Sequence, residues 1–139
     1  MIDCFATDHA PHLLSEKDGA SPPPGFPGLE SALPLLLTAV HEGKLELDDV
    51  IERMHTNPMR IFGIRSDDST YVEVDPDARW QLSAAHMFSK AAWTPFEGRE
   101  VAGRVERVVL RGTEVFADGQ VTAEPGTGRD IRTEEEHDE

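Results

Sequence analysis

Residues 2–12 read IDCFATDHAPH, and the interpretation of the fold starts from this stretch. Its first part, residues 2–6, is a short apolar run bounded by polar residues, which is typical of a buried parallel strand and too short for a stable helix. Asp8, His9 and His12 follow at the carboxyl end of the predicted strand. Because the active sites of α/β folds gather at the carboxyl ends of their strands, these side chains are the candidate functional residues.

The spacing of these three side chains leaves two interpretations open. An aspartate and two histidines can supply oxygen and nitrogen ligands to zinc, but a loop does not fix their geometry as a helical HExxH motif does. The same residues are also typical of a hydrogen-bonded turn aspartate with two surface histidines. Cys4 is the only cysteine of the chain, so it forms no internal disulfide, and we expect it to be a small buried hydrophobic residue.

Length and charge exclude several classes of protein. The chain has 139 residues, and its 13 basic and 27 acidic side chains give a net charge of 13 − 27 = −14. A complete (β/α)₈ barrel needs about 250 residues, so any such barrel is incomplete here. The negative charge disfavours binding to nucleic acid and to anionic membranes. No run approaches the roughly 18 apolar residues that cross a bilayer, and no secretory signal pattern is present, so we expect a cytoplasmic location.

Two helices are predicted after a proline-rich stretch at residues 22–28 (PPPGFPG). Residues 29–40 are apolar on nearly all sides and predict a buried helix, with Gly43 at its C-terminal cap and Pro34 either in its opening turn or at a bend. A second helix, which Asn57-Pro58 is expected to end, is predicted from apolar residues at helical spacing: Leu47, Val50, Ile51 and Met54.

Strands are predicted in the second half of the chain, where the apolar period changes to two. Residues 71–74 and 80–82 predict two β segments, and residues 101–121 predict a hairpin region with turns at Gly112-Thr113 and Asp118-Gly119. The aromatic residues Trp80, Trp93 and Phe96 are expected in the core of this β part. The order of elements therefore indicates the end of an α/β domain joined to a small β domain, with the sheet neighbours of the first strand missing.

Several motifs carry a resemblance to a known family. DCFATDHAPH at residues 3–12, Glu16-Lys17 and PPPGFPGLE at residues 22–30 resemble the dihydroorotases of the amidohydrolase superfamily. The resemblance extends over residues 2 to about 130 and looks closest to the dihydroorotase domain of CAD-like multifunctional polypeptides of animals. It implies an α/β fold class, namely the C-terminal fragment of a TIM-type (β/α)₈ barrel followed by a small antiparallel β domain.

The resemblance also implies a division of the chain into three parts. Residues 1–66 would hold the last barrel strand, the active-site loop and the C-terminal helices of the barrel. Residues 67–126 would form the small β domain. Residues 127–139 would be an acidic tail, expected to be disordered because residues 130–139 carry six acids and one arginine.

Three site residues are implied by the resemblance. Asp8 matches the aspartate that binds a zinc ion and carries a proton from the bridging hydroxide to the departing amide nitrogen, a role that suits a weak base. His12 matches the histidine that contacts the carboxylate of dihydroorotate, and Pro24 matches a residue whose backbone contacts the same ligand. No ligand role transfers to His9, which we expect to orient the Asp8 loop by a hydrogen bond. The prolines at 22–24 are interpreted as a wall for the substrate, with a polyproline II ligand for a partner domain as the alternative.

The other residues of the family site have no match: a His-x-His pair, a carboxylated lysine, two further histidines, and the substrate-binding arginine and asparagine. Catalytic zinc usually has three protein ligands and a water, so Asp8 alone is not expected to hold the binuclear Zn²⁺ centre, and the isolated chain is expected to be inactive.

The predicted function is the C-terminal portion of a zinc-dependent dihydroorotase, which interconverts carbamoyl aspartate and dihydroorotate in pyrimidine biosynthesis. The expected partners are the rest of the barrel, within a longer polypeptide that is CAD-like or separate, and further copies in a homo-oligomer. Two alternatives remain: a non-catalytic dihydroorotase-like interaction module, and a remnant of a hydantoinase- or allantoinase-type amidohydrolase.

Overall fold

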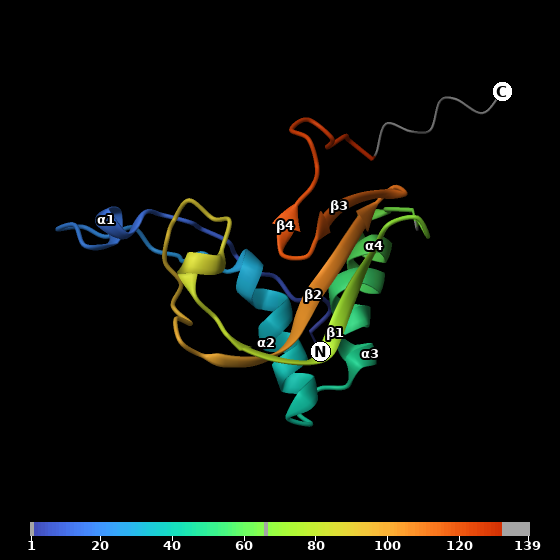
Figure 1. Cartoon of the computed structure of the whole chain (residues 1–139), viewed down its shortest axis with the longest axis horizontal. Helices are drawn as coiled ribbons and strands as arrows, with labels where there is room; N and C mark the ends of the chain where they lie inside the picture. Colours follow the sequence, from blue (N-terminus) through green and yellow to red (C-terminus); the bar gives the residue numbers. More distant parts are fainter. Residues whose placement is uncertain (1, 66, 132–139) are drawn as a thin grey trace.

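The computed structural model describes residues 2–65 and 67–131. Helices occupy the first half of the chain: α1 (Leu14–Lys17), α2 (Leu29–His41), α3 (Leu47–Ile51), the π-helical segment η1 (Glu52–Thr56) and α4 (Asn57–Phe62). The second half holds β1 (Tyr71–Gln81), the 3₁₀ turn η2 (Ala84–His86), β2 (Glu100–Leu110), β3 (Thr113–Ala117) and β4 (Gln120–Val121). The strands form an antiparallel sheet in the order β1-β2-β3-β4 (Figure 1), so the predicted sequence of helices before antiparallel strands is confirmed.

The two β segments predicted at 71–74 and 80–82 belong to one strand, β1. Its pairing with β2 is irregular between Asp75 and Arg79, where Pro76 has no backbone N–H to donate. The Asp75 side chain accepts hydrogen bonds from the backbone amides of Asp77 (2.9 Å) and Ala78 (3.2 Å), which stabilises the irregularity. The prediction of two separate segments was therefore wrong, because a side chain bridges the break in the ladder.

Tight turns connect β2, β3 and β4. Arg111 and Gly112 have φ of 50° and 74°, and Asp118 and Gly119 have φ of 50° and 75°, the left-handed pairs that suit two-residue hairpins. The second turn lies where it was predicted. The first lies one residue earlier than the predicted Gly112-Thr113, because Thr113 already pairs with Leu110 in the ladder.

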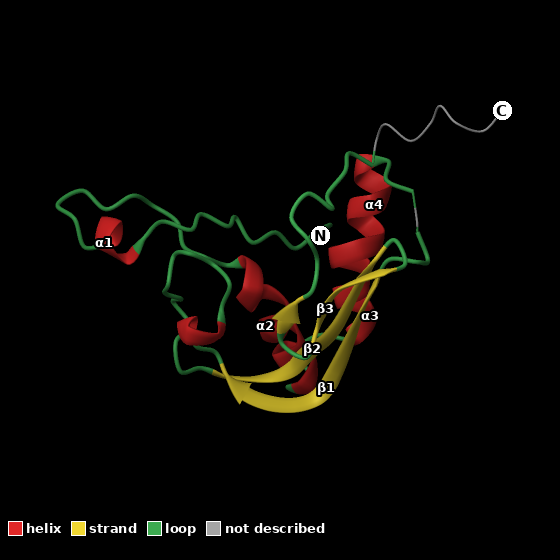
Figure 2. Cartoon of the chain, turned by 45° about the horizontal axis from the view of Figure 1, so that its top comes forward, coloured by secondary structure: helices red, strands yellow, loops and turns green. Residues whose placement is uncertain are grey.

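Helix α2 packs directly on β2, and this contact forms the centre of the described core (Figure 2). A Cβ added to Gly103, whose φ is 82°, would lie 2.5 Å from Cδ1 and 2.8 Å from Cβ of Leu37, so the strand backbone approaches the helix closely. Thr38 Oγ1 donates to the carbonyl of Pro34 (2.7 Å) and accepts from the amide of Ala102 (2.9 Å), so this hydroxyl group links the helix to the strand. Because α2 begins at Leu29, Pro34 lies inside the helix rather than in its opening turn.

The predicted helix end at Asn57-Pro58 was wrong. The backbone amide of Asn57 donates to the carbonyl of Glu52, a π-helical bond, and Pro58 then lies in the first turn of α4, where its missing N–H is tolerated. The helical path continues to Gly63, whose φ of 66° provides the left-handed cap.

The predicted buried strand at residues 2–6 is not formed in the described chain. Ile2 is 65% exposed, Cys4 is a half-buried free thiol rather than a buried one, and the residues have no strand partner among the described ones. The physical reason is that a parallel strand exists only with hydrogen-bonded neighbours.

The described helices α1 to α4 fall within residues 1–66 and the strands within 67–126, while the division into domains stays a prediction. Of the predicted acidic tail at 127–139, residues 132–139 lie outside the described residues. Among the described helices, none is long and apolar enough to cross a membrane.

Candidate functional site

Asp8 lies at the end of the extended N-terminal segment and is exposed. Its φ is 46°, a left-handed conformation that a non-glycine residue adopts at a cost. Its carboxylate has no hydrogen bond or ion pair with any described residue. An exposed carboxylate without a partner among the described residues is available to bind an incoming ligand.

His9 holds the loop after Asp8 against the start of α2. Its Nδ1 accepts hydrogen bonds from the backbone amides of Gly28 (3.1 Å) and Leu29 (3.2 Å), which have no partner within the helix. The residue also forms an isolated parallel bridge with Phe26. The expected orienting hydrogen bond of His9 is therefore present, and its imidazole caps a helix.

His12 is half-buried on the same loop. Its Nδ1 lies 3.7 Å from a carboxylate oxygen of Glu16, and its backbone carbonyl accepts a hydrogen bond of 2.7 Å from the indole Nε1–H of Trp93. The remainder of its imidazole is open to solvent, with 39% of the side chain exposed.

Residues 7–28, called the 7–28 loop below, run out past α1 and return to α2 (Figure 1). Pro24 belongs to the second half of this loop and is exposed. The outgoing and returning arms meet where the amide of Ala10 donates to the carbonyl of Phe26 (3.0 Å). Gly25 has φ of 96°, and a Cβ there would lie 2.4 Å from that of Ala10, so only glycine permits this approach. This contact brings the arm with Pro24 beside the arm that bears Asp8, His9 and His12.

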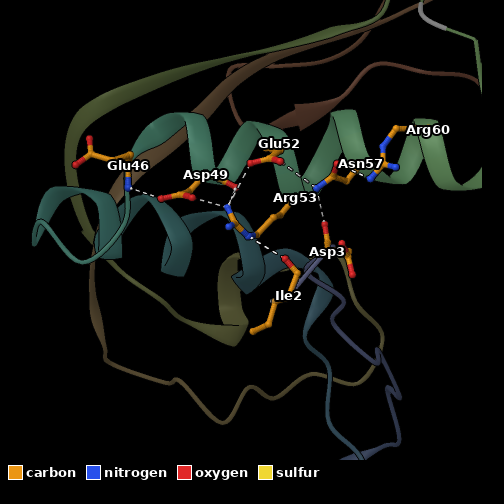
Figure 3. A network of polar contacts seen from close by, with 8 residues as sticks. All are labelled: Ile2, Asp3, Glu46, Asp49, Glu52, Arg53, Asn57 and Arg60. Carbon is orange, nitrogen blue, oxygen red and sulfur yellow. Dashed lines mark hydrogen bonds and ion pairs between the residues drawn. The ribbon is translucent and has the colours of Figure 1, made fainter.

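A polar network fastens the segment before Asp8 to the helices (Figure 3). Arg53 donates from Nε to the carbonyl of Ile2 (3.2 Å) and from Nη1 to Asp49 (2.5 Å), and its own carbonyl accepts from the amide of Phe5 (3.2 Å). Asn57 Nδ2 donates to the carbonyl of Asp3 (2.9 Å). These bonds hold the segment in place although it has no strand partner among the described residues.

The charge on Asp49 supports this network. The backbone amide of Glu46 and the guanidinium of Arg53 hold the pKa of Asp49 below its ordinary value, so the carboxylate is ionised at neutral pH and pairs with Arg53.

An open, mostly apolar groove of about 240 Å³ lies at the base of the 7–28 loop, beside α2. It is lined chiefly by aliphatic and aromatic side chains: Phe5, Ala6, Thr7, Phe26, Gly28, Ser31, Ala32, Leu35, Leu36, Met54 and Phe96. Phe26 and Phe96 close one wall with their ring centroids 6.1 Å apart.

The described residues do not form a metal centre by themselves. Within residues 2–65 and 67–131, no three His, Cys, Asp or Glu side chains are grouped so that they hold an ion. Zinc in proteins has three or four ligands, and Asp8 provides one. The side chains present therefore fit one ligand of a zinc site and not a complete site.

Two residues of this region were missed or misplaced by the sequence analysis. Trp93 was expected in the core of the β part, but it is half-buried and binds the 7–28 loop through His12. Lys17 was quoted only as part of a motif, yet its Nζ binds the carbonyls of Pro23 (2.5 Å) and Gly25 (2.6 Å). Nothing in the spacing of the sequence signals the contact between Trp93 and His12, which lie 81 positions apart, and the contacts of Lys17 depend on how the loop turns back at Gly25.

Known proteins resemble the chain over nearly its whole length. It is 56% identical over 132 residues to the multifunctional protein CAD of Squalus acanthias, covering 95% of this chain and 6% of that protein. It is 41% identical over 138 residues to the dihydroorotase of Pyrococcus abyssi, covering 94% of this chain and 33% of that protein. The chain thus spans about a third of a single-function relative and a small part of a multifunctional one. No known family model matches the sequence.

Solved structures agree with these relatives. The inactive dihydroorotase-like domain of the Chaetomium thermophilum CAD-like multifunctional protein superposes with a TM-score of 0.73 at 31% identity, covering 93% of this chain and 36% of that one. The D-hydantoinase (dihydropyrimidinase) of a Thermus species superposes with a TM-score of 0.85 at 28% identity, covering 94% of this chain and 31% of that one.

Proposed function

Because this chain belongs to the dihydroorotases by sequence, we propose that it forms the C-terminal portion of a zinc-dependent dihydroorotase. The complete enzyme would close carbamoyl aspartate to dihydroorotate and reopen the cyclic amide. In this proposal the chain completes a TIM-type barrel and adds the small β domain, in a cytoplasmic enzyme that is CAD-like or separate and assembles as a homo-oligomer. The rest of the barrel would come from polypeptide that corresponds to the remaining two thirds of a single-function relative.

The observation that carries the proposal is the state of Asp8. It follows a segment held by Arg53 and Asn57, its backbone is in the left-handed region, and its carboxylate has no partner among the described residues. Residues held in the left-handed region are frequent at ligand and active sites, and an exposed carboxylate without a protein partner remains available to a ligand. We assign Asp8 as one ligand of the zinc centre, with the other ligands on the rest of the polypeptide.

Asp8 is also suited to move a proton. A carboxylate is a weak base, so one of its oxygens can accept a proton during ring opening and return it to the amide nitrogen that leaves. His12 would hold the carboxylate of the substrate by donating from its imidazole N–H. The backbone at Pro24 would contact the same substrate, with the Pro24 carbonyl as an acceptor and the Gly25 amide as a donor. The contact of the two loop arms at Ala10 and Phe26 supports their joint use.

The test is a chimera in which this chain replaces the matching segment of the Pyrococcus abyssi dihydroorotase. We expect the purified chimera to hydrolyse dihydroorotate and the 139-residue chain alone to be inactive. Hydantoin is the comparison substrate, since D-hydantoinases share the fold. Turnover of hydantoin without turnover of dihydroorotate would reverse the substrate assignment.

A second candidate function is a non-catalytic dihydroorotase-like module. It is favoured by one observation, the likeness to a solved domain described as inactive. This candidate predicts a folded chimera that turns over neither substrate. A matched chimera built with the corresponding segment of the Pyrococcus furiosus dihydroorotase controls for damage caused by the junctions.

A further inference from the structure

Lys17 occupies an unusual position for a lysine of an exposed loop. It is half-buried, and its ammonium group binds two backbone carbonyls, those of Pro23 at 2.5 Å and Gly25 at 2.6 Å. The same Nζ lies 5.7 Å from the ring centroid of Trp93. A lysine usually keeps its charge in water, so a cation held by two carbonyls and an aromatic face indicates a structural task.

The two carbonyls flank Pro24. The Pro23 carbonyl belongs to the peptide unit before the one that joins Pro24 to Gly25, and the Gly25 carbonyl belongs to the peptide unit after it. Lys17 therefore fixes the planes of these two flanking peptide units. The Pro24 carbonyl and the Gly25 amide have no hydrogen-bond partner within the described part of the chain. The arrangement therefore leaves one peptide unit available to a ligand while its neighbours are held.

Trp93 connects this cation to His12. Its indole Nε1–H donates to the His12 carbonyl at 2.7 Å, while its ring faces Lys17. Trp93 belongs to the segment between β1 and β2, and the amides of Phe88 and Ser89 in the same segment donate to Glu30 of α2 at 2.8 and 2.9 Å. The segment that bears Trp93 is therefore bound to α2 by contacts that do not involve the 7–28 loop.

We propose that Lys17 and Trp93 are positioning residues that hold His12 and the Pro24 peptide in one arrangement for a substrate that carries a carboxylate. The proposal rests on the proposed function for the identity of that substrate. Neither residue touches the substrate: Lys17 acts through the backbone on either side of Pro24, and Trp93 acts through the His12 carbonyl.

The first experiment measures the two indole N–H groups of the full 139-residue chain by NMR, because Trp80 provides an internal control. The Trp80 indole also donates to a backbone carbonyl, that of Gly103 at 2.9 Å, and its ring also faces a cation, Arg104 at 5.3 Å. Lys17→Met is expected to speed hydrogen exchange of the Trp93 indole roughly tenfold and to leave that of Trp80 unchanged. Arg104→Met, the matched variant, is expected to leave Trp93 unchanged.

The second experiment measures steady-state kinetics in the chimera with dihydroorotate. Lys17→Met is expected to raise KM roughly tenfold with kcat changed less than about threefold, and Lys17→Arg, which keeps the charge and the donors, to restore most of the loss. Trp93→Phe keeps an aromatic face but removes the indole donor, and it is expected to raise KM severalfold. A purely structural lysine would lower the amount of folded enzyme without changing KM.

The outcomes separate this inference from the proposed function. An active chimera whose KM stays the same in the Lys17→Met variant overturns the positioning role and leaves the function standing. An unchanged Trp93 indole in that variant also overturns it. An inactive chimera beside an active Pyrococcus furiosus control refutes the proposed function, and with it the substrate side of the inference, whatever the indole signals do.

Discussion

The 7–28 loop and the antiparallel sheet obtain their hydrogen bonds in different ways. Each strand of the sheet pairs with the next one along the chain through a ladder of backbone bonds, and this holds even for β1 and β2, where Tyr71 pairs with Val109. The loop has only the short helix α1, and its backbone is held by side chains such as His9, Lys17 and Trp93. The segment leading into it is held by Arg53 and Asn57.

Because of this difference, we expect the sheet to contribute mainly to the stability of the fold and the 7–28 loop mainly to the chemistry of the candidate site. The ladder repeats its backbone bonds along each strand, and tight turns and apolar alternation specify the pairing of β2 with β3 and of β3 with β4. The 7–28 loop carries Asp8, His12 and Pro24, and it depends on a few side chains that each hold one or two backbone groups. Changes in the loop should therefore alter activity, and changes in the sheet should alter unfolding.

The largest expected effect is a loss of activity without a loss of fold. Asp8→Asn in the chimera should lower kcat for dihydroorotate about a thousandfold, because the amide neither accepts the proton nor binds a cation as a carboxylate does. Thermal unfolding should stay unchanged, since the Asp8 carboxylate has no partner among the described residues. Asp3→Asn makes the same change in the same segment and should keep activity. A comparable loss of activity in the Asp8→Asn and Asp3→Asn variants would contradict the special role of Asp8 in the loop.

The next effect is expected in the sheet. Gly103→Ala places a methyl group 2.5 Å from Leu37 Cδ1 at a φ of 82°, so overpacking and backbone strain should together lower the free energy of unfolding by about 2–4 kcal/mol. Gly119→Ala has a φ of 75° and nothing within 4 Å of the added Cβ, so it should cost only the strain, about 1 kcal/mol. Urea unfolding measures both. Equal losses would show that the contact between α2 and β2 is not tight.

A smaller effect is expected from His12. His12→Ala in the chimera should raise KM for dihydroorotate roughly tenfold with little change in kcat, because in the proposed function His12 is one donor to the substrate carboxylate. His55→Ala removes another exposed imidazole and should leave both constants unchanged. An unchanged KM in the His12 variant refutes its role in binding the substrate.

The smallest effect is a pH dependence at the entry to the sheet. Hydrogen bonds from the hydroxyl groups of Ser69 and Thr70 and from the Ser69 amide hold the pKa of Asp67 below its ordinary value of 3.8. Because the folded pKa is lowered, this stabilisation is present above the ordinary value and is lost as the pH falls through the folded pKa. Asp67→Asn should therefore lower Tm slightly at neutral pH, and the difference should disappear in acid.

The control for this prediction is Asp68→Asn, which removes a charge from the same loop without those hydrogen bonds. It should leave Tm nearly unchanged at both pH values. A pH-independent difference for Asp67→Asn would mean that its carboxylate does not support the turn.

Much of the fold could be predicted because its signals are local. The helix at residues 29–40, its cap at Gly43 and the turn at Asp118-Gly119 follow from apolar spacing and from residues that tolerate a left-handed backbone. The interpretation of Asn57-Pro58 as a helix end was wrong because the helix widens into a π-helical turn, in which the Asn57 amide bonds to the Glu52 carbonyl, and continues past Pro58. The strand predicted at residues 2–6 needed partners that the described chain does not contain.

The candidate site divides in the same way. Which side chains can do chemistry, namely Asp8 and His12, is written in the order of residues 2–12, because residue type sets what a group can donate, accept or ligate. Where those groups are held was decided only by the tertiary structure: Lys17 binds carbonyls on either side of Pro24 within its own loop, and Trp93 reaches His12 from 81 positions away. Neither contact leaves a periodic pattern in the sequence, since the first depends on the path of an irregular loop and the second on how packed elements bring distant residues together.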